Sequence, residues 1–458
     1  PPAPLVTFFV ISIIGIGLVG HYWLMSGYAI SRDEQMAIFD GVFLARGEFV
    51  GQIPAQWQGF KAALNDTFII RELGGSFWAS GYRPGNAFIY GLFGRLGAAE
   101  LVNPIWSAIG LIATWRIALR LWPEARDAQS VAVILYVLSS QMLVASMTSY
   151  AMSAHLALNM VWLALFLADR RWTHIAALLV GALAVGLHQI PYHPMFVAPF
   201  VALALWQRRW ATVAFYSIGY AIIILAWTYY SRLPLEAADV AYIKHDSQGL
   251  AYLITRMLKP FGEISLENIW IMAADMLRFF AWQHLLLLPL MLIGGRAAWQ
   301  SRDPLQIALV AAFMLTFFVK LALRPHQGHG WGFRYMHGLI GVACLIAANG
   351  WMDLRRRDLV GWRSLKWSSI ATVAIVMPWL AFQAHQFTEI FASVDRRIAR
   401  QSAQLVVVDD GAVPYGKDLV FNRPEVDNRP VRLRATALRP EQIVDLCNRY
   451  SVAVIGPN

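Results

Sequence analysis

Two adjacent carboxylates, Asp33 and Glu34, follow the first membrane-length apolar run of the chain, which covers residues 4–28 and carries no Asp, Glu, Lys or Arg. Ionised side chains are costly to place beside hydrocarbon, and carboxylates do not assist insertion of the preceding helix. A carboxylate in this position can serve as a general base. It can also cap the helix that follows, since negative charge is favoured at a helix N-terminus. The residues alone leave both roles open.

A second polar cluster, residues 324–337, reads Arg-Pro-His-Gln-Gly-His-Gly-Trp-Gly-Phe-Arg-Tyr-Met-His. Glycines let the backbone approach a ligand closely, and arginine binds phosphates and carboxylates with two parallel hydrogen bonds. The alternative is a belt of interfacial aromatic side chains with arginines that reach for water. Because polar clusters at membrane depth are usually functional, we predict a ligand site that contains Arg334, His326, His329, Tyr335 and His337.

Two further histidines, His188 and His193, flank a tight turn with the sequence His-Gln-Ile-Pro-Tyr-His-Pro. With Asp33 or Glu34 they could supply the ligands of zinc or manganese. No His-x-x-x-His or Glu-x-x-His spacing is present, however. We therefore favour a proton relay or a hydrogen-bond network to the substrate, and we expect no metal and no cofactor.

The composition identifies an integral membrane protein, with 58% hydrophobic residues, 14% charged residues and a mean hydropathy of +0.48. Soluble domains carry about 25% charged residues. Apolar runs near the 20 residues that a bilayer requires recur along the chain. We expect about eleven spans, near residues 4–28, 101–121, 128–146, 150–168, 174–188, 194–207, 211–231, 270–293, 305–323, 335–351 and 367–386.

The net charge of +10 arises mainly from arginines in short gaps between these spans, so no nucleic-acid partner is expected. The basic residues gather in alternate gaps, at Arg116, Arg120, Arg126, Arg170, Arg171, Arg208, Arg209, Arg296, Arg302, Arg355, Arg356, Arg357, Arg363 and Lys366. The positive-inside rule places these gaps in the cytoplasm. The N-terminus is then cytoplasmic, and the C-terminal tail lies outside the membrane.

Long loops fall on the opposite, outer side, which indicates that the chemistry takes place there. The first runs over residues 29–100 and is expected to hold two amphipathic helices along the membrane surface, near 37–44 and 87–96. The second, residues 232–269, contains Lys244 as a candidate substrate contact, although a solvated polar loop is the alternative.

The tail is expected to form a small β/α module, with strands at 405–408 and 452–456 and a helix at 440–450 that begins with proline. We therefore predict a mainly α, polytopic membrane domain over residues 1–388 and a β/α domain over 389–458. The tail contains neither a dinucleotide fingerprint nor a P-loop.

These features together resemble the GT-C glycosyltransferases, in particular the branch with protein O-mannosyltransferases and the aminoarabinose transferase of lipid A. The shared pattern is one span, an outer loop that opens with Asp33-Glu34 and holds two juxtamembrane helices, about ten more spans and an outer C-terminal domain. The family often has His-Pro-Pro before the second juxtamembrane helix. Tyr82-Arg83-Pro84-Gly85 occupies that place here, with a basic residue and one proline retained.

The resemblance implies transfer of a sugar from a polyprenyl-phosphate donor to a lipid, polysaccharide or protein acceptor, with inversion, at the outer face of a bacterial inner membrane. A lipid phosphate departs without a general acid, so one carboxylate, Asp33, suffices as the base. The implied role of Glu34 is to orient the acceptor. Arg83, Arg334 and the histidines named above are the expected contacts to the donor phosphate and substrate.

Two other classes of membrane protein remain as alternatives. An O-antigen ligase or polymerase also uses polyprenyl-linked sugars, but its main loop lies late in the chain, whereas this chain has Asp33-Glu34 in an early loop. A transporter or flippase predicts charges near mid-membrane and repeated halves. We find no internal repeat in the sequence, and its polar residues gather towards one side.

Overall fold

The structure is a computed structural model that describes residues 1–64, 67–240, 261, 264–323, 327–412 and 415–456. The chain is mainly helical, as expected. It divides into two compact units, one made of residues 1–20, 100–227 and 243–383, and the other of residues 21–99, 228–242 and 384–458. We call them the helical unit and the mixed unit. Their limits do not coincide with the predicted domains, because the first outer loop clusters with the tail.

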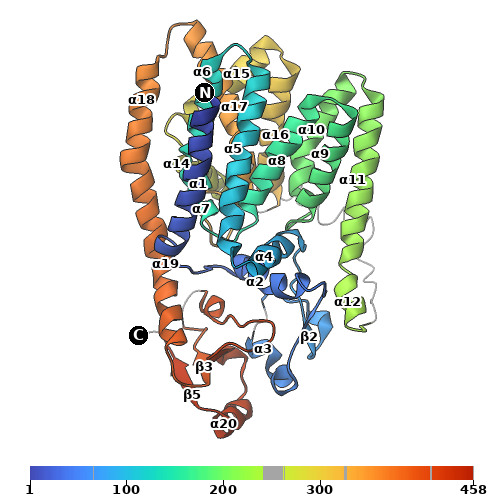
Figure 1. Cartoon of the computed structure of the whole chain (residues 1–458), viewed down its shortest axis with the longest axis vertical. Helices are drawn as coiled ribbons and strands as arrows, with labels where there is room; N and C mark the ends of the chain where they lie inside the picture. The colour runs from blue at the N-terminus through green and yellow to red at the C-terminus, as the bar shows by residue number, and fades with distance from the viewer. Residues whose placement is uncertain (65–66, 241–260, 262–263, 324–326, 413–414, 457–458) are drawn as a thin grey trace. The chain divides into compact units, whose positions relative to one another are not determined.

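The helical unit contains most of the apolar helices, many of them packed side by side (Figure 1). They are α1 (Ala3–Trp23, which runs on into the mixed unit), α5 (Val102–Leu121), α6 (Arg126–Val137), α7 (Ser140–Ser146), α8 (Met152–Ala168), α9 (Arg171–Val185), α10 (Tyr192–Trp206), α11 (Trp210–Tyr230), α14 (Leu266–Ala281), α15 (Leu287–Ser301), α16 (Pro304–Ala322), α17 (Ile340–Arg356) and α18 (Trp362–Ala371). A π-helical turn, Thr372–Val376, joins α18 to α19 (Met377–Ala399).

In the described part of the chain, six helices are long and apolar enough to cross a membrane, or seven if the bent pair α6 and α7 counts as one span. Three shorter apolar helices, α8, α9 and α10, coincide with predicted spans. The count of eleven therefore stays a prediction. The single span at 270–293 is wrong: α14 ends at Ala281 and α15 begins at Leu287.

The break between α14 and α15 has a physical cause in its polar side chains. Gln283 donates to the Gln141 side chain at 3.1 Å, and His284 is hydrogen-bonded to Ser369 at 3.0 Å. Both residues are almost completely buried. Residues of α7 and α18 thus hydrogen-bond with two polar side chains at the break, which favours an interruption of the apolar run at this point.

Helix α17 lies at the centre of the helical unit, with residues 340–348 almost completely buried. It crosses α15 backbone to backbone, because a Cβ atom at Gly294 would lie 1.9 Å from the Ile346 carbonyl oxygen. Small residues permit such close approach between membrane helices. By contrast, α11 exposes Ile218, Ile222 and Leu225, as a helix facing lipid does.

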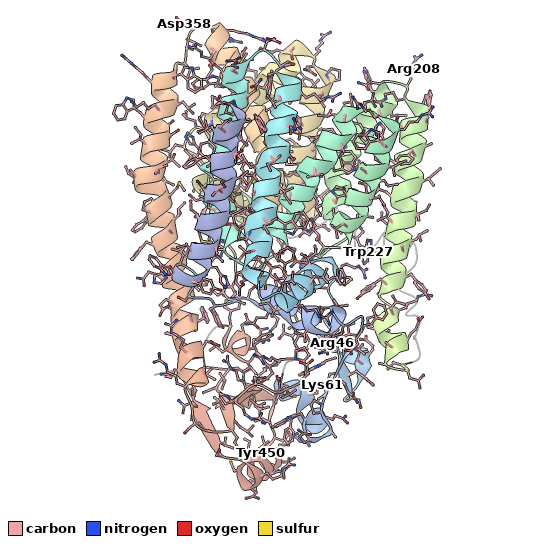
Figure 2. The ribbon with its side chains drawn as sticks, viewed as in Figure 1. Arg46, Lys61, Arg208, Trp227, Asp358 and Tyr450 are labelled. Carbon is pink, nitrogen blue, oxygen red and sulfur yellow. The ribbon has the colours of Figure 1, made fainter. Side chains whose placement is uncertain are left out.

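Two of the gaps predicted to be cytoplasmic lie at one end of the helical unit. Arg208 follows α10, Asp358 follows α17, and both appear at the same end of the helices (Figure 2). This common end agrees with the alternation of basic gaps along the sequence.

The mixed unit combines the first outer loop with the tail. Its outer-loop elements include α2 (Arg32–Leu44), α4 (Gly85–Arg95) and an antiparallel pair, β1 (Gly51–Gln52) with β2 (Phe77–Trp78). Its tail forms a parallel sheet in the order β4-β3-β5, from β3 (Leu405–Val408), β4 (Val431–Arg434) and β5 (Val452–Ile455), with α20 (Pro440–Arg449) between β4 and β5.

One apolar core holds the two parts of the mixed unit together. Phe39 of α2 packs edge-on against Trp78, with ring centroids 5.0 Å apart. The same cluster contains Leu405 of β3 and Val431 of β4. The tail and the first outer loop therefore share a core, although hundreds of residues separate them.

Candidate active site

The N-terminus of α2 presents a single carboxylate. Of residues 32–35, all of which the structure describes, Arg32, Glu34 and Gln35 are at most 2% exposed, whereas Asp33 is half-buried. The Glu34 carboxylate accepts the Ile30 backbone N–H at 3.1 Å. Glu34 thus has a local structural partner, and Asp33 is the carboxylate of the pair that is more open to a substrate.

The neighbours of Asp33 attach α2 to the tail. Arg32 donates to the carbonyl oxygens of Val420, at 3.1 Å, and Lys417. Gln35 donates to the Asp418 carbonyl oxygen at 2.7 Å. These acceptors lie in or beside a 3₁₀ helix, Gly416–Leu419. The helix that carries Asp33 is therefore fixed by side chains on both sides of Asp33.

The segment after β2 contacts α2 through two carboxylates. The Tyr82 hydroxyl donates to Asp33, while Asp40 accepts the Ser80 backbone N–H at 3.0 Å and the Ser80 hydroxyl. Burial raises the pKa of Asp40 to about 7, against the opposing effect of the Ser80 hydrogen bonds. Our sequence analysis did not identify Asp40. Its spacing of seven residues from Asp33, two helical turns, was the available signal.

Helices α2 and α4 approach each other through glycine. A Cβ atom at Gly91 would lie 2.1 Å from the Gly41 carbonyl oxygen. Arg83, just before α4, is half-buried, and its burial lowers the pKa of the guanidinium while the nearby Tyr230 raises it. Arg83, the candidate phosphate contact of the first outer loop, thus belongs to the mixed unit, as Asp33 does.

The helical unit contains a second polar cluster around a buried lysine. Lys320, at the end of α16, donates to the Tyr192 hydroxyl at 2.7 Å. Its ammonium lies 4.1 Å from the ring centroids of both Tyr192 and Tyr335. Arg334 lies over the rings of Tyr150 and Tyr335, at 5.4 and 5.5 Å. Two basic side chains therefore lie close to the ring of Tyr335, which makes this cluster a candidate anion site.

The glycine-rich segment 327–332 is held in place by side chains from α14, from the connection between α7 and α8 and from the segment itself. Arg278 of α14 donates to the Gly330 carbonyl oxygen at 2.6 Å, and Tyr150 donates to that of His329 at 3.3 Å. Gln327 donates to the Gly332 carbonyl oxygen at 2.8 Å. Gly328, Gly330 and Gly332 all have positive φ, which explains the glycines at these positions.

The predicted histidines of the helical unit have mainly structural partners. His193 is hydrogen-bonded to Asn159 at 2.7 Å and to Tyr220 at 2.8 Å. His337 lies 3.5 Å from the Gln141 amide nitrogen. His188 is half-buried beyond the end of α9. These side chains position the helices around the cluster of Lys320 and Arg334.

The structure thus distributes the predicted residues over both units. Asp33, Glu34 and Arg83 lie in the mixed unit, and His188, His193, His329, Arg334, Tyr335 and His337 in the helical unit. Lys244 and His326 fall outside the described residues. Within the described ranges, no group of three or more His, Cys, Asp or Glu side chains could hold a metal ion.

The apolar helices, the helices α2 and α4 and the β/α tail form a fold that matches solved structures from the predicted branch, so the resemblance is confirmed at the level of the fold. The structures that match include two crystal structures of ArnT from Cupriavidus metallidurans, one bound to undecaprenyl phosphate and one in the apo state.

Both matches extend over almost the whole chain. The TM-score is 0.51 in each case, with 12% and 11% sequence identity, 98% and 97% of this chain covered, and 95% of each ArnT chain. No family model matches the sequence, and no curated protein matches it significantly. At this identity the likeness establishes the fold, so the chemistry must be argued from the residues.

Proposed function

We propose that the protein is a membrane glycosyltransferase that moves a sugar from a polyprenyl-phosphate donor to an acceptor hydroxyl, with Asp33 as the general base. The observation that carries the proposal is the local geometry of Asp33. It is the half-buried carboxylate of a helix terminus whose other side chains are buried and engaged. The likeness to ArnT, crystallised with undecaprenyl phosphate, supports a lipid-phosphate donor.

The proposed reaction is a single displacement with inversion. The acceptor oxygen attacks the anomeric carbon as the bond from that carbon to the phosphate oxygen breaks, and the acceptor proton passes to Asp33. The polyprenyl phosphate leaves as an anion and needs no general acid. The hydroxyl of Tyr82 orients the Asp33 carboxylate, and Glu34 maintains the turn before α2 through the Ile30 N–H.

Cations must stabilise the charge that develops on the leaving phosphate. We propose Arg334 as the principal phosphate contact, with Lys320 beside it on Tyr335, and Arg83 as a further candidate. His188, His193, His329 and His337 are proposed to support substrate binding. Transfer is proposed to occur at the outer face of a bacterial inner membrane, with a lipid, polysaccharide or protein as acceptor.

The test is sugar transfer in membranes that receive a panel of radiolabelled polyprenyl-phosphate sugars. Asp33→Asn should reduce transfer about 100-fold or more, because it keeps the side-chain volume and removes the base. Asp427→Asn, which neutralises an exposed carboxylate of the same unit, should leave transfer unchanged. Equal transfer by wild type and Asp33→Asn would remove Asp33 from the mechanism.

The native cysteines can test the proposed orientation. Cys447 is exposed on α20, and Cys344 is buried in α17. A membrane-impermeant maleimide should label Cys447 in spheroplasts without permeabilisation, while Cys344 stays unlabelled. Labelling of Cys447 only after permeabilisation would place the tail in the cytoplasm and reverse the proposed topology.

A further inference from the structure

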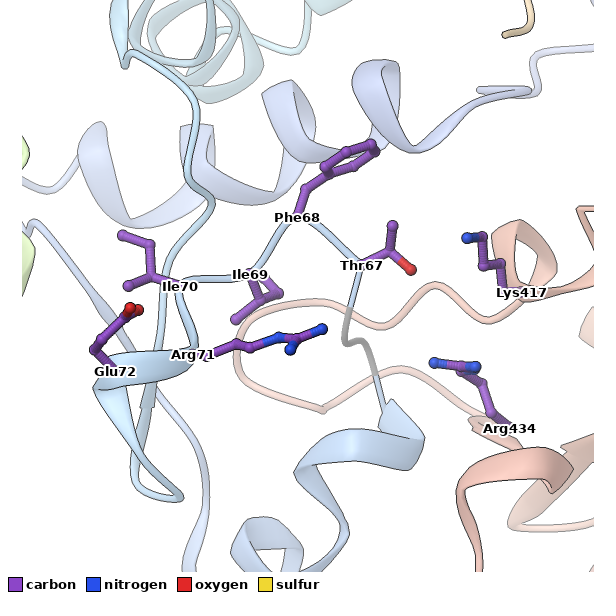
Figure 3. Close-up of a pocket in the computed structure, with 8 residues that line it drawn as sticks. All are labelled: Thr67, Phe68, Ile69, Ile70, Arg71, Glu72, Lys417 and Arg434. Atoms are coloured by element: carbon purple, nitrogen blue, oxygen red, sulfur yellow. The ribbon is translucent and has the colours of Figure 1, made fainter. Parts of the chain in front are cut away.

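The mixed unit contains a pocket of about 630 Å³ that the proposed reaction does not yet use (Figure 3). Among the described residues it is lined by Thr67, Phe68, Ile69, Ile70, Arg71, Glu72, Lys417 and Arg434. The lining combines the first outer loop with two segments of the tail, and all of these residues belong to one compact unit. None of them lies in a candidate membrane span.

Three basic side chains converge on this pocket. Figure 3 shows Arg71 directed into it from one side and Lys417 and Arg434 from the other, with Thr67 between them; Glu72 adds one carboxylate to the lining. Arginines bind phosphates and carboxylates with paired hydrogen bonds, and lysine adds a point charge. The pocket therefore has the chemistry of an anion site.

An ion pair with Asp410 fixes the position of the Arg434 side chain at the pocket. Its Nε atom lies 2.8 Å from the buried carboxylate of Asp410, which also accepts the Thr436 backbone N–H at 3.1 Å. Arg434 is the last residue of β4, and Asp410 follows the end of β3. The pocket thus lies at the carboxyl ends of parallel strands, where ligands of α/β folds commonly bind.

The pocket adjoins the site of Asp33 along two routes. The ring centroids of Phe68, at the rim of the pocket, and Tyr82 lie 5.3 Å apart, and the Tyr82 hydroxyl donates a hydrogen bond to Asp33. The backbone carbonyl oxygen of Lys417 accepts a hydrogen bond from the Arg32 guanidinium. Phe68 is 49% exposed and has a φ of +65°, an unfavourable backbone conformation for a bulky residue. An exposed aromatic ring held in this way between the pocket and Asp33 could stack on a sugar.

We infer that this pocket is the acceptor subsite, that it binds a phosphate or carboxylate group carried by an acceptor sugar, and that it directs an acceptor hydroxyl towards Asp33. The inference rests on the proposed function. The donor is the less suitable occupant, because its phosphate is attached to a chain that stays in the bilayer, whereas the pocket is lined by residues outside the candidate spans.

Binding to the purified full-length protein tests the pocket independently of turnover. Isothermal titration with glucose 6-phosphate and with glucuronate distinguishes the two anions. We expect one of them to bind the wild type, and the double variant Arg71→Gln/Lys417→Gln to weaken its binding at least tenfold. Arg400→Gln, which removes an exposed charge elsewhere in the unit, serves as the control. Arg434→Lys keeps the charge but loses paired hydrogen bonding, and should weaken binding less than the double variant does.

Transfer in native membranes tests the assignment to the acceptor. The sugar that binds should inhibit wild-type transfer in competition with the acceptor, and the double variant should raise the acceptor KM at least tenfold with the donor KM unchanged. Failure of both sugars to bind, binding that the double variant retains, or a change confined to the donor KM would each overturn the inference. If wild type transfers no sugar from any donor, the proposed function fails, while titration still decides whether the pocket binds anions.

Discussion

Substitution of Asp40 by asparagine should stabilise the protein at neutral and alkaline pH. The carboxyl of Asp40 is buried against Ser80, and burial raises its pKa from 3.8 to about 7. The folded protein therefore retains a proton that the unfolded chain releases above pH 4. The free energy of unfolding should fall by roughly 1.4 kcal/mol per pH unit between the two pKa values, about 4 kcal/mol in total.

Asparagine resembles the protonated acid and cannot ionise. Its carbonyl oxygen can accept the Ser80 backbone N–H, and its amide can donate to the Ser80 hydroxyl, so both contacts of Asp40 have replacements. Asp40→Asn should therefore lack the pH dependence of the wild type over this range. Asp40→Ala leaves the Ser80 N–H without its acceptor, and should destabilise the protein by about 1–3 kcal/mol at pH 5.

The assay is the apparent melting temperature of the purified full-length protein between pH 5 and pH 8, measured from the soluble fraction that survives heating. Wild type should lose stability relative to Asp40→Asn as the pH rises, and the two should converge near pH 4. A constant difference across this range, or an Asp40→Asn variant that is less stable at pH 8, would refute the assignment of a raised pKa to Asp40.

Three further substitutions test contacts of the two candidate sites. Tyr82→Phe should lower sugar transfer about tenfold at unchanged melting temperature, because it removes the hydroxyl that donates to Asp33; unaltered transfer would exclude that role. Gly91→Ala should destabilise α2 against α4 by about 1–3 kcal/mol and increase sensitivity to protease, whereas Gly94→Ala, whose Cβ would meet nothing within 4 Å, should not. Lys320→Met should raise the donor KM about tenfold, with Lys320→Arg closer to wild type; an unchanged donor KM in Lys320→Met would separate this cluster from the donor phosphate.

Run length and local pattern were sufficient to predict most of the helices. Predicted runs such as 101–121 and 305–323 agree with α5 and α16 to within one residue at each end. The predicted span at 270–293 was wrong because the apolar run was judged over its whole length, with Trp282 counted as apolar and the polar Gln283 and His284 averaged out. The partners that satisfy those two polar residues lie in other helices, so no local pattern reveals the break.

The candidate site was only partly accessible to sequence reasoning for the same physical reason. Asp33 and Arg334 stand in conspicuous local contexts, and both lie in polar clusters. Asp40 was missed because its partner, Ser80, is 40 residues away. Lys320 looked like an ordinary charge at a helix end, and only the fold brings the rings of Tyr192 and Tyr335 to 4.1 Å from its ammonium.

The placement of Arg32 explains why an early loop and a late tail form one unit. Arg32 is 2% exposed, and its guanidinium contacts the carbonyl oxygens of Val420 and Lys417 and the carboxylate of Asp418, which belong to the tail. Removal of partners from a buried charge typically costs 3–5 kcal/mol, so α2 cannot keep this arrangement without the tail. Because Asp33 is the next residue, the position of the proposed base depends on segments almost 400 residues further along the chain. The tail is therefore part of the architecture of the proposed active site, and an acceptor bound to Lys417 and Arg434 would be held by the same segments that position Asp33.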